Sequence, residues 1–434
     1  MAAADDAAPA DPLAARSAVG DPGGRKRALA EKLGNFEIQD IVVFDEATTA
    51  YPELFGHLGP TQTFGPYTYR YDSVTQNYLA LTDTEIVLMG PLVNSPTVPV
   101  VYASLASFCA APETARFCGH TERRVLQVGG QQREYIVYVP WKSRTATNVP
   151  VVMMLHGTSG DGEKYYSESG WREKADETGL IAVFPSALWH CYLQDNDKNG
   201  TIDPLTEREV FTKWAAGKLG DPAERPLCTA AQMQGLTAEK RALVDHPLAD
   251  DMAFFRQIVA DLGANFDIDR KRIYVSGFSN GAEMSGRLAA EAADLFAAVA
   301  CASSVVSVDT IASRPLSVIW SVGELDPEQS VALGYANGVI PLTADLGTNP
   351  RFMGGVEQHY THMLNLSRTK THSQLTAWGL LISHFAYTTS LAGAGNTFNS
   401  YVIQGLRHEY PNGKNHPVRM ADALWEFFKT QSLP

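Results

Sequence analysis

The chain has no long hydrophobic run and no excess of positive charge. Among its 434 residues, no stretch approaches the roughly 18 consecutive apolar residues that a membrane-spanning helix needs. Asp and Glu (48) outnumber Lys and Arg (35), so the formal net charge at pH 7 is -13. A negatively charged chain is not attracted to phosphate backbones or anionic lipid. Nucleic acid and membrane insertion are therefore not expected, while the oligomeric state is left open.

The chain also lacks a visible secretory leader. Residues 1–35 are rich in Ala, Asp, Pro and Gly, which predicts a disordered arm. They contain no apolar segment of the kind that forms the centre of a signal peptide. Either the chain is cytosolic, or an original signal has been removed. We expect the second case, a secreted protein of the extracellular space or the periplasm.

Cysteine is scarce, with five residues in the chain. Cys109 and Cys118 bracket a short polar loop, and Cys191 and Cys228 bracket an apparent insertion. Secreted proteins commonly oxidise such pairs. We expect these two disulfides and one buried thiol at Cys301; the alternative is five unpaired thiols in a reducing cell.

Residues 36–118 are rich in β-prone residues and show no helical periodicity. The runs EIQDIVVFDE, PYTYRYD, NYLALTDTEIVLMG and VPVVYASLASFC are separated by turn residues. This pattern predicts hairpins in a small accessory region. No catalytic constellation is visible in it.

From residue 119 onward, apolar strands alternate with amphipathic helices. A hairpin is expected around 129–130. The expected strands lie at 150–157, 180–187, 272–278, 296–304, 315–323 and 399–405, and the expected helices around 168–178, 250–263, 280–293 and 418–429. Continuously apolar strands imply burial on both faces. Residues 119–434 are therefore predicted to form one α/β catalytic domain, a doubly wound and mainly parallel sheet.

Two insertions interrupt this domain, at about 191–245 and 327–398. Both follow predicted strands at their C-terminal ends. Open α/β sheets place their ligands at that edge. The insertions are expected near the rim of the active site, as walls of the substrate site.

A serine boxed by glycines lies between a predicted strand and a predicted helix. The sequence Gly277-Phe-Ser279-Asn-Gly281 has the G-x-S-x-G pattern of a nucleophile elbow. Glycines are needed on both sides because the strand and the helix approach closely at the strained serine. Ser279 is the predicted nucleophile; the alternative is a structural turn.

A serine hydroxyl needs a base, and the base needs a carboxylate to orient it. In this architecture the acid and the histidine follow the serine along the chain, each after a later strand. Asp326 directly follows PLSVIWSVGEL and His408 directly follows NSYVIQGLR. Glu324 is the competing acid, although it is expected at the strand end rather than beyond it. His416, before Pro and the last helix, is expected to be a capping or surface residue.

The histidines of the second insertion have no strand-end context. They are His359, His362, His372 and His384. We expect them to be satisfied or exposed, although one could line the cleft.

Acyl transfer also requires two N–H donors for the oxyanion. The backbone N–H of Asn280, next to the nucleophile, is the first candidate. The second is the N–H of Thr158 in the loop HGTSGDG after the strand at 150–157. His156, on the wrong strand for a general base, is expected to fix that loop.

Several motifs occur in the order of a known family. LHGTSGDG, ADDMAFFRQIV, RIYVSGFSNGAEMSGRLA, FAAVACASS, VGELD and GLRHEYPNG together resemble the polyhydroxybutyrate depolymerase and feruloyl or acetylxylan esterase group of the α/β-hydrolase superfamily. The resemblance covers roughly 119–434 and implies Ser279, Asp326 and His408 as the triad. In the family, Trp-Pro often follows the histidine; here the segment is His408-Glu-Tyr-Pro, so Tyr410 takes the aromatic place.

The expected function is a serine carboxylic ester hydrolase that works through an acyl-enzyme without a catalytic cofactor. A polyester of hydroxyalkanoate type is the first expected substrate. The alternatives are a feruloyl or acetylxylan esterase, a serine peptidase, and a polymer-binding protein without activity. Three aromatic residues are candidates for substrate binding, with a core position as the alternative for each: Trp189, Tyr410 and Trp378.

A weaker pattern suggests a structural calcium ion. DNDKNGTID at 195–203 resembles most of an EF-hand loop, in which oxygen ligands surround the ion near a glycine. The twelfth position is Thr206 rather than the bidentate Glu. The candidate ligands are Asp195, Asp197, Asn199 and Asp203; the alternative is a solvated acidic turn.

Overall fold

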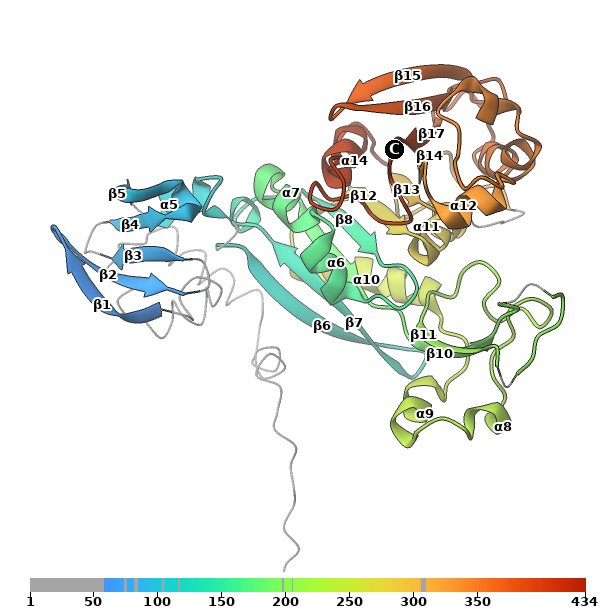
Figure 1. The fold of residues 1–434 in the computed structure, drawn as a ribbon, viewed down its shortest axis with the longest axis horizontal. Coiled ribbons are helices and arrows are strands. Elements are labelled where there is room, and N and C mark those ends of the chain that lie inside the picture. The colour runs from blue at the N-terminus through green and yellow to red at the C-terminus, as the bar shows by residue number, and fades with distance from the viewer. Residues whose placement is uncertain are drawn as a thin grey trace, which may run out of the picture.

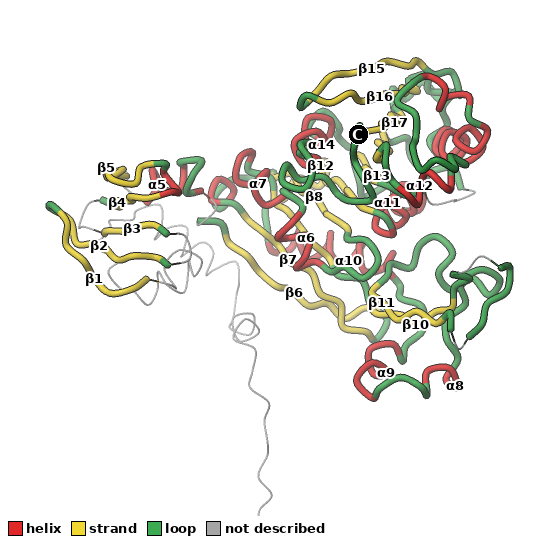
Figure 2. The backbone as a smooth tube through the Cα atoms, in the orientation of Figure 1, coloured by secondary structure: helices red, strands yellow, loops and turns green. Residues whose placement is uncertain are grey.

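The computed structural model describes residues 58–73, 76–81, 85–103, 105–115, 118–196, 199–204, 206–305 and 310–434. The predicted arm at 1–35 and the first predicted strand at 37–46 lie outside this part. The chain forms an N-terminal β-sheet followed by a larger α/β unit (Figures 1 and 2). No described helix is both long and apolar enough to cross a membrane.

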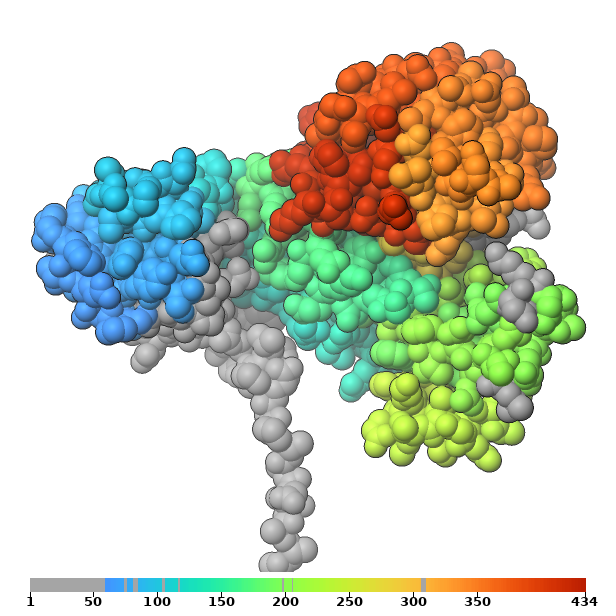
Figure 3. Space-filling model, in the orientation of Figure 1, coloured from blue at the N-terminus to red at the C-terminus, as the bar shows by residue number. Residues whose placement is uncertain are grey.

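The N-terminal sheet is an antiparallel meander with its strands in sequence order. Tyr69, Ala80 and Val87 form one buried cluster in it, and Leu79, Ile86 and Leu88 are also buried. Figure 3 shows this sheet, in blue, as a lobe beside the α/β unit. Its strands are β1 (Leu58–Phe64), β2 (Tyr67–Asp72), β3 (Asn77–Leu81), β4 (Ile86–Gly90) and β5 (Ser95–Tyr102), and helix α5 (Leu105–Ala110) follows.

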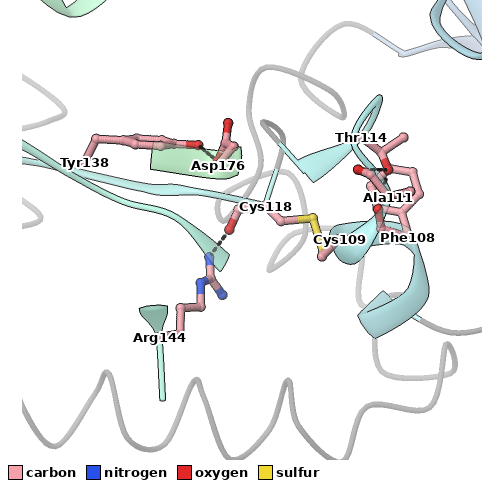
Figure 4. Close-up of a disulfide and its surroundings, with 8 residues drawn as sticks. All are labelled: Phe108, Cys109, Ala111, Thr114, Cys118, Tyr138, Arg144 and Asp176. Atoms are coloured by element: carbon pink, nitrogen blue, oxygen red, sulfur yellow. Dashed lines mark hydrogen bonds between the residues drawn. A yellow bond between two sulfur atoms is a disulfide. The ribbon is translucent and has the colours of Figure 1, made fainter. Parts of the chain in front are cut away.

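A disulfide lies at the junction of the two units. Cys109, in α5, bonds to Cys118, which precedes the first strand of the α/β unit (Figure 4). Arg144 donates a hydrogen bond of 2.6 Å to the carbonyl oxygen of Cys118. The second expected disulfide, Cys191–Cys228, is also present, and Cys301 is a buried free thiol. The predicted cysteine pairing is confirmed.

The α/β unit is built on a ten-stranded sheet in the order β15-β16-β17-β14-β13-β12-β8-β9-β7-β6. The central strands β9, β8, β12, β13, β14 and β17 are parallel, and the β6–β7 hairpin is antiparallel. This is the α/β-hydrolase fold, as predicted. The bounds are β6 (His120–Val128), β7 (Gln131–Val139), β8 (Val149–Leu155), β9 (Ile181–Pro185), β12 (Ile268–Phe278), β13 (Ala298–Ala302), β14 (Ser317–Gly323) and β17 (Phe398–Ile403).

Helices cover both faces of this sheet, so alternate strand residues enter different cores. Val152 and Met154 of β8 pack in one cluster with α7 (Trp171–Thr178) and α14 (Met420–Phe428). Val151 and Met153 pack in the other, with α10 (Asp251–Asn265) and α11 (Asn280–Glu291). Each large apolar side chain buried in this way contributes roughly 1.5–3 kcal/mol. Burial on both faces explains why the strands are continuously apolar.

The predicted helix around 168–178 is present as α7. A further helix that was not predicted, α6 (Gly162–Glu168), precedes it, and the two are separated at Gly170. Gly170 has a φ of 79°, a conformation that glycine adopts readily and that ends a helix.

The first insertion forms a small structure of its own. Strands β10 (Trp189–Leu193) and β11 (Arg208–Thr212) pair as a two-stranded sheet. Two short helices follow, α8 (Ala230–Met233) and α9 (Ala238–Val244). The Cys191–Cys228 bond ties the hairpin to the segment that leads into these helices.

The second insertion does more than form a wall. It contains α12 (Pro327–Ala332), two further helical turns (Ala344–Thr348 and Phe352–Glu357), α13 (Gln358–Met363), β15 (Thr371–Ala377) and β16 (Leu380–Tyr387). β15 and β16 extend the main sheet as antiparallel strands beside β17. The expectation of a wall alone was incomplete, because it did not include these strands; β15 is mostly exposed, and β16 lies between β15 and β17.

Candidate active site

Ser279 lies on a sharp turn between β12 and α11. Its φ of 51° and ψ of -122° are strained for a residue with a side chain. The backbone N–H of Ser279 donates to the carbonyl oxygen of Ala302, at the end of β13, over 2.8 Å. This bond holds the turn against the neighbouring strand, and the turn has the geometry expected of a nucleophile elbow.

The two glycines of the motif are required by close packing. A Cβ at Gly277 would lie 2.1 Å from the carbonyl oxygen of Gly281, and a Cβ at Gly281 would lie 2.4 Å from that of Leu155. Both contacts are with backbone, which cannot move aside. The glycines therefore allow β12, α11 and β8 to meet at the serine.

The structure brings the three predicted triad residues together. Nε2 of His408 lies 3.1 Å from Oγ of Ser279, and Nδ1 of His408 lies 2.9 Å from Oδ2 of Asp326. Each residue follows one of the parallel strands β12, β14 and β17 at its C-terminal end. The arrangement has the contacts that serine activation requires.

Asp326 is held in place by the start of α12. Its side chain is fully buried, and Oδ1 accepts hydrogen bonds from the backbone N–H groups of Glu328 and Gln329, both over 3.0 Å. Oδ2 is left to face His408. The imidazole also packs against Phe278, with ring centroids 4.9 Å apart.

The competing residues lie elsewhere. Glu324 accepts a hydrogen bond from the backbone N–H of Gly405, and His416 contacts the carbonyl oxygen of Gln404. His372 and His384 lie on β15 and β16, where they contact Ser383 and Asn399. His359 and His362 are in α13. None of these six lines the pocket at Ser279.

Asn280 and Thr158, the two predicted oxyanion residues, both line the pocket beside Ser279. The N–H of Asn280 is in the first turn of α11, where a helix has no acceptor for it. The end of β11 and the residues after it contact Asn280 and Ser159, the residue next to Thr158. Trp214 donates its backbone N–H to Oδ1 of Asn280 over 2.7 Å, and Thr212 accepts the N–H of Ser159 over 2.9 Å.

His156 fixes the loop that carries Thr158. Its Nδ1 donates to the carbonyl oxygen of Gly157 over 2.7 Å, and its Nε2 accepts the N–H of Ala187 over 2.9 Å. Burial lowers the pKa of His156 to about 4, so the ring is neutral and can both donate and accept. The side chain acts on the loop, as the sequence suggested.

The Asn280–Trp214 contact leads to a prediction. Asn280→Ala removes the acceptor for the buried N–H of Trp214 and is expected to loosen the turn that carries the predicted oxyanion amide. We expect kcat to fall by about 10-fold to 100-fold, below the roughly 10²–10³-fold cost of losing an oxyanion donor outright, with little change in KM. Steady-state kinetics on p-nitrophenyl acetate measure this. Ser285→Ala, later in the same helix, is the control; an unchanged kcat in Asn280→Ala would contradict the role.

The environment of His408 sets the pH at which it can act as a base. Burial lowers the pKa of His408, but the hydrogen bond and charge of Asp326 and the charge of Glu328 outweigh burial and raise it. Glu328 Oε2 lies 3.7 Å from Nε2 of His408. A base must be neutral, so a raised pKa moves the acid limb of the activity profile to higher pH.

Glu328→Gln is therefore expected to move the acid limb of kcat/KM to lower pH, because it removes a charge that favours the imidazolium. The plateau at high pH should change little. Glu328 is 66% exposed, so the shift should shrink in about 1 M salt, where the screening length is about 3 Å. An acid limb that stays in place or moves to higher pH at low salt would refute this assignment.

The pocket at Ser279 has a volume of about 500 Å³ and a mostly polar lining. The first insertion supplies Tyr192, Gln194, Glu209, Phe211, Lys213 and Arg225. The prediction that this insertion is a wall of the site is consistent with its position. The individual charged residues were missed, because no motif surrounds them and only the fold brings them to the serine.

The three aromatic candidates for substrate binding do not line this pocket. Tyr410 is buried in the core, where its hydroxyl contacts Trp171 Nε1 at 3.0 Å and Ser276 Oγ at 3.2 Å. Trp378 is 42% exposed at the β15–β16 turn. Trp189 begins β10, and its carbonyl oxygen contacts a histidine of the same insertion. The prediction was wrong about their positions, because a motif place or a strand end does not give the direction of a side chain.

The candidate calcium loop uses its oxygen atoms internally. Asp195 accepts the backbone N–H of Asn199 over 3.1 Å, and the buried Glu207 accepts the backbone N–H of Asp203 over 2.8 Å. Asp197 lies outside the described residues. Among the described residues, no group of three or more His, Cys, Asp or Glu side chains is gathered as a metal site would require. The calcium ion stays a prediction.

The comparisons with known proteins match one family model and several enzymes named as esterases. A model of the prolyl oligopeptidase family matches residues 240–353, which include Ser279 and Asp326 and end before His408. Feruloyl esterase B of Talaromyces funiculosus is 21% identical over 304 residues, covering 63% of this chain and 69% of that enzyme. The bifunctional acetylxylan esterase/xylanase of Neocallimastix patriciarum is 25% identical over 203 residues, covering 45% of this chain and 22% of that protein.

The chain spans about half the length, or less, of several curated relatives that it matches. Among solved structures, an acetyl xylan esterase from Aspergillus awamori is similar with a TM-score of 0.42 and 13% identity, covering 71% of this chain and 99% of that one.

Proposed function

We propose that the chain is a serine-dependent carboxylic ester hydrolase that works through an acyl-enzyme. The observation that carries this proposal is the hydrogen-bonded series Ser279–His408–Asp326 at the floor of an open pocket. The strained serine turn and the two amides beside it add the remaining parts of an acyl-transfer site.

The proposed reaction proceeds in two steps. His408 Nε2 takes the proton of Ser279 Oγ as the oxygen attacks the ester carbonyl, and it returns that proton to the leaving alcohol. The N–H groups of Asn280 and Thr158 bind the oxyanion of each tetrahedral intermediate. Water then attacks the acyl-enzyme by the same route. Asp326 keeps the imidazole oriented and stabilises its positive charge.

Acetyl or feruloyl esters of plant polysaccharide are the favoured substrates, since the relatives with matching sequence are named for these activities. A polyester of hydroxyalkanoate type is the second candidate and is supported by the motif resemblance alone. Secretion is part of the proposal, and the two disulfides support it.

A serine peptidase is the third candidate, since the prolyl oligopeptidase model matches part of the chain. One panel separates the three: release of acetate from acetylated xylan and of ferulate from feruloylated arabinoxylan, clearing of a polyhydroxybutyrate suspension, and cleavage of peptide p-nitroanilides. Turnover of at least one ester, with no peptide cleavage, supports the proposal. Peptide cleavage alone would replace it with the peptidase.

A further inference from the structure

Lys213 is a buried cation in the wall of the pocket at Ser279. It directly follows β11 and is 5% exposed. Its Nζ donates to Oγ1 of Thr158 over 3.0 Å and lies 5.6 Å from the ring centroid of Tyr192. Within the described part of the chain, no carboxylate lies within ion-pair distance of it. Buried charges are normally paired. The ammonium group of Lys213 is therefore suited to bind a negatively charged group of a ligand.

Arg225 is a second cation in the same pocket. Its side chain is partly buried, and no described residue makes a hydrogen bond or ion pair with it. Burial lowers the pKa of Lys213; the charge of Glu283 opposes this, the charge of Arg225 lowers the pKa further, and the charges of Glu328 and Glu209 also oppose the lowering. Like charges in one pocket repel, and a bound anion would relieve that repulsion.

The carboxylates of this pocket are engaged elsewhere or lie at its rim. Glu283 accepts from Asn280 Nδ2 at 3.0 Å and from Ser304 Oγ at 3.2 Å. Glu209 accepts from Asn196 Nδ2 at 2.7 Å. Glu328 is exposed beside the histidine. The pocket lining thus holds three carboxylates and three cations, the third cation being the exposed Lys164, and the carboxylates disfavour a dianion such as a phosphate ester.

We propose that Lys213 and Arg225 form a carboxylate subsite, so that the preferred substrates are esters with a free carboxylate near the scissile bond. This inference rests on the proposed ester hydrolase function and names its substrate class. The carboxylate can be on the alcohol side, as at the free-acid end of a hydroxyalkanoate oligomer or in an esterified acidic sugar. It can also be on the acyl side, as in a hemiester of a dicarboxylic acid.

The test compares matched charged and neutral esters. On the acyl side, p-nitrophenyl hemiglutarate is compared with p-nitrophenyl valerate. On the alcohol side, β-acetoxybutyrate is compared with β-acetoxybutyramide. The measured quantity is the ratio of kcat/KM for the charged ester to that for the neutral one. We expect a ratio above about 10 for at least one pair, the size of one good charge-assisted contact, and the pair that gives it identifies the side.

Three variants assign that ratio to its residues. Lys213→Met and Arg225→Met should each lower the ratio by about 10-fold, whereas Lys213→Arg should keep most of it because the charge remains. Lys218→Met is the matched control: Lys218 lies on the same insertion, is 49% exposed and pairs with Glu224 at 2.8 Å. The charged-to-neutral kcat/KM ratio of Lys218→Met should equal that of the parent. Thermal melting checks folding, and replacing a buried charge with an apolar chain is often neutral for stability.

Two results would overturn the subsite. If the parent has a charged-to-neutral kcat/KM ratio of one or below for both the acyl-side pair and the alcohol-side pair, the carboxylate subsite is contradicted. If Lys213→Met lowers kcat/KM equally for charged and neutral esters, Lys213 is instead a positioning residue that holds the Thr158 loop.

If the parent hydrolyses no ester, the proposed function fails, and binding then decides the subsite separately. Calorimetry of Ser279→Ala protein with glutaramate, which carries one carboxylate, against neutral glutaramide, should show tighter binding of glutaramate that is lost when Lys213→Met is added. Equal binding of the two would contradict the subsite.

Discussion

Replacing Ser279 with alanine is expected to lower kcat for p-nitrophenyl acetate by at least about 10⁴-fold, to a level set by the oxyanion amides and binding alone. In the proposed mechanism Oγ of Ser279 forms the acyl bond, and this oxygen lies 3.1 Å from Nε2 of His408. The loss should therefore appear in kcat and in the pre-steady-state burst of p-nitrophenol together.

The control for this variant is Ser276→Ala, three residues earlier, on the strand β12 that ends just before Ser279. Ser276 is buried and contacts the hydroxyl of Tyr410 at 3.2 Å, away from the pocket. Its loss should cost about 1 kcal/mol of stability and leave kcat within a few-fold of the parent. Both variants should keep the parent circular dichroism spectrum. Substantial turnover in Ser279→Ala, with Ser276→Ala behaving as described, would mean that another group is the nucleophile.

The sheet and the triad could be predicted because both depend on local patterns. Strands buried on both faces are continuously apolar, as in PVVMML of β8, and the strand order follows from the chain order of the α/β-hydrolase fold. A strand end also indicates where Asp326 and His408 emerge, since they lie three residues after β14 and five residues after β17. No knowledge of distant contacts was needed to choose Asp326 over Glu324.

The pocket wall could not be predicted in the same way. Lys213 and Arg225 belong to an insertion whose path is set by a disulfide and by contacts of Trp214 with the serine turn. No sequence motif near Lys213 or Arg225 indicates that these residues lie close to Ser279. The aromatic candidates failed for a related reason, since Tyr410 occupies the place that the motif assigns but its ring turns into the core between Trp171 and Ser276. Side-chain direction is decided by packing, which the sequence alone does not give.

Asp326→Asn is expected to lower kcat by about 10⁴-fold, the usual cost of holding the imidazole in the wrong tautomer. Oδ1 of Asp326 accepts from the N–H groups of Glu328 and Gln329, both 3.0 Å away. Only the oxygen of an asparagine can keep those two bonds, so its NH₂ group must face Nδ1 of His408. Nδ1 then becomes an acceptor and Nε2 carries the proton.

A protonated Nε2 points a hydrogen at Ser279 Oγ and cannot take its proton, so the variant should fold normally and lack the base. Asparagine has nearly the same shape as the fully buried aspartate that it replaces. The melting temperature should therefore stay close to that of the parent although kcat falls. Glu324→Gln is the control, since Glu324 accepts from Gly405 and does not touch the histidine. A kcat within 10-fold of the parent in Asp326→Asn would show that the orientation of His408 does not depend on this carboxylate.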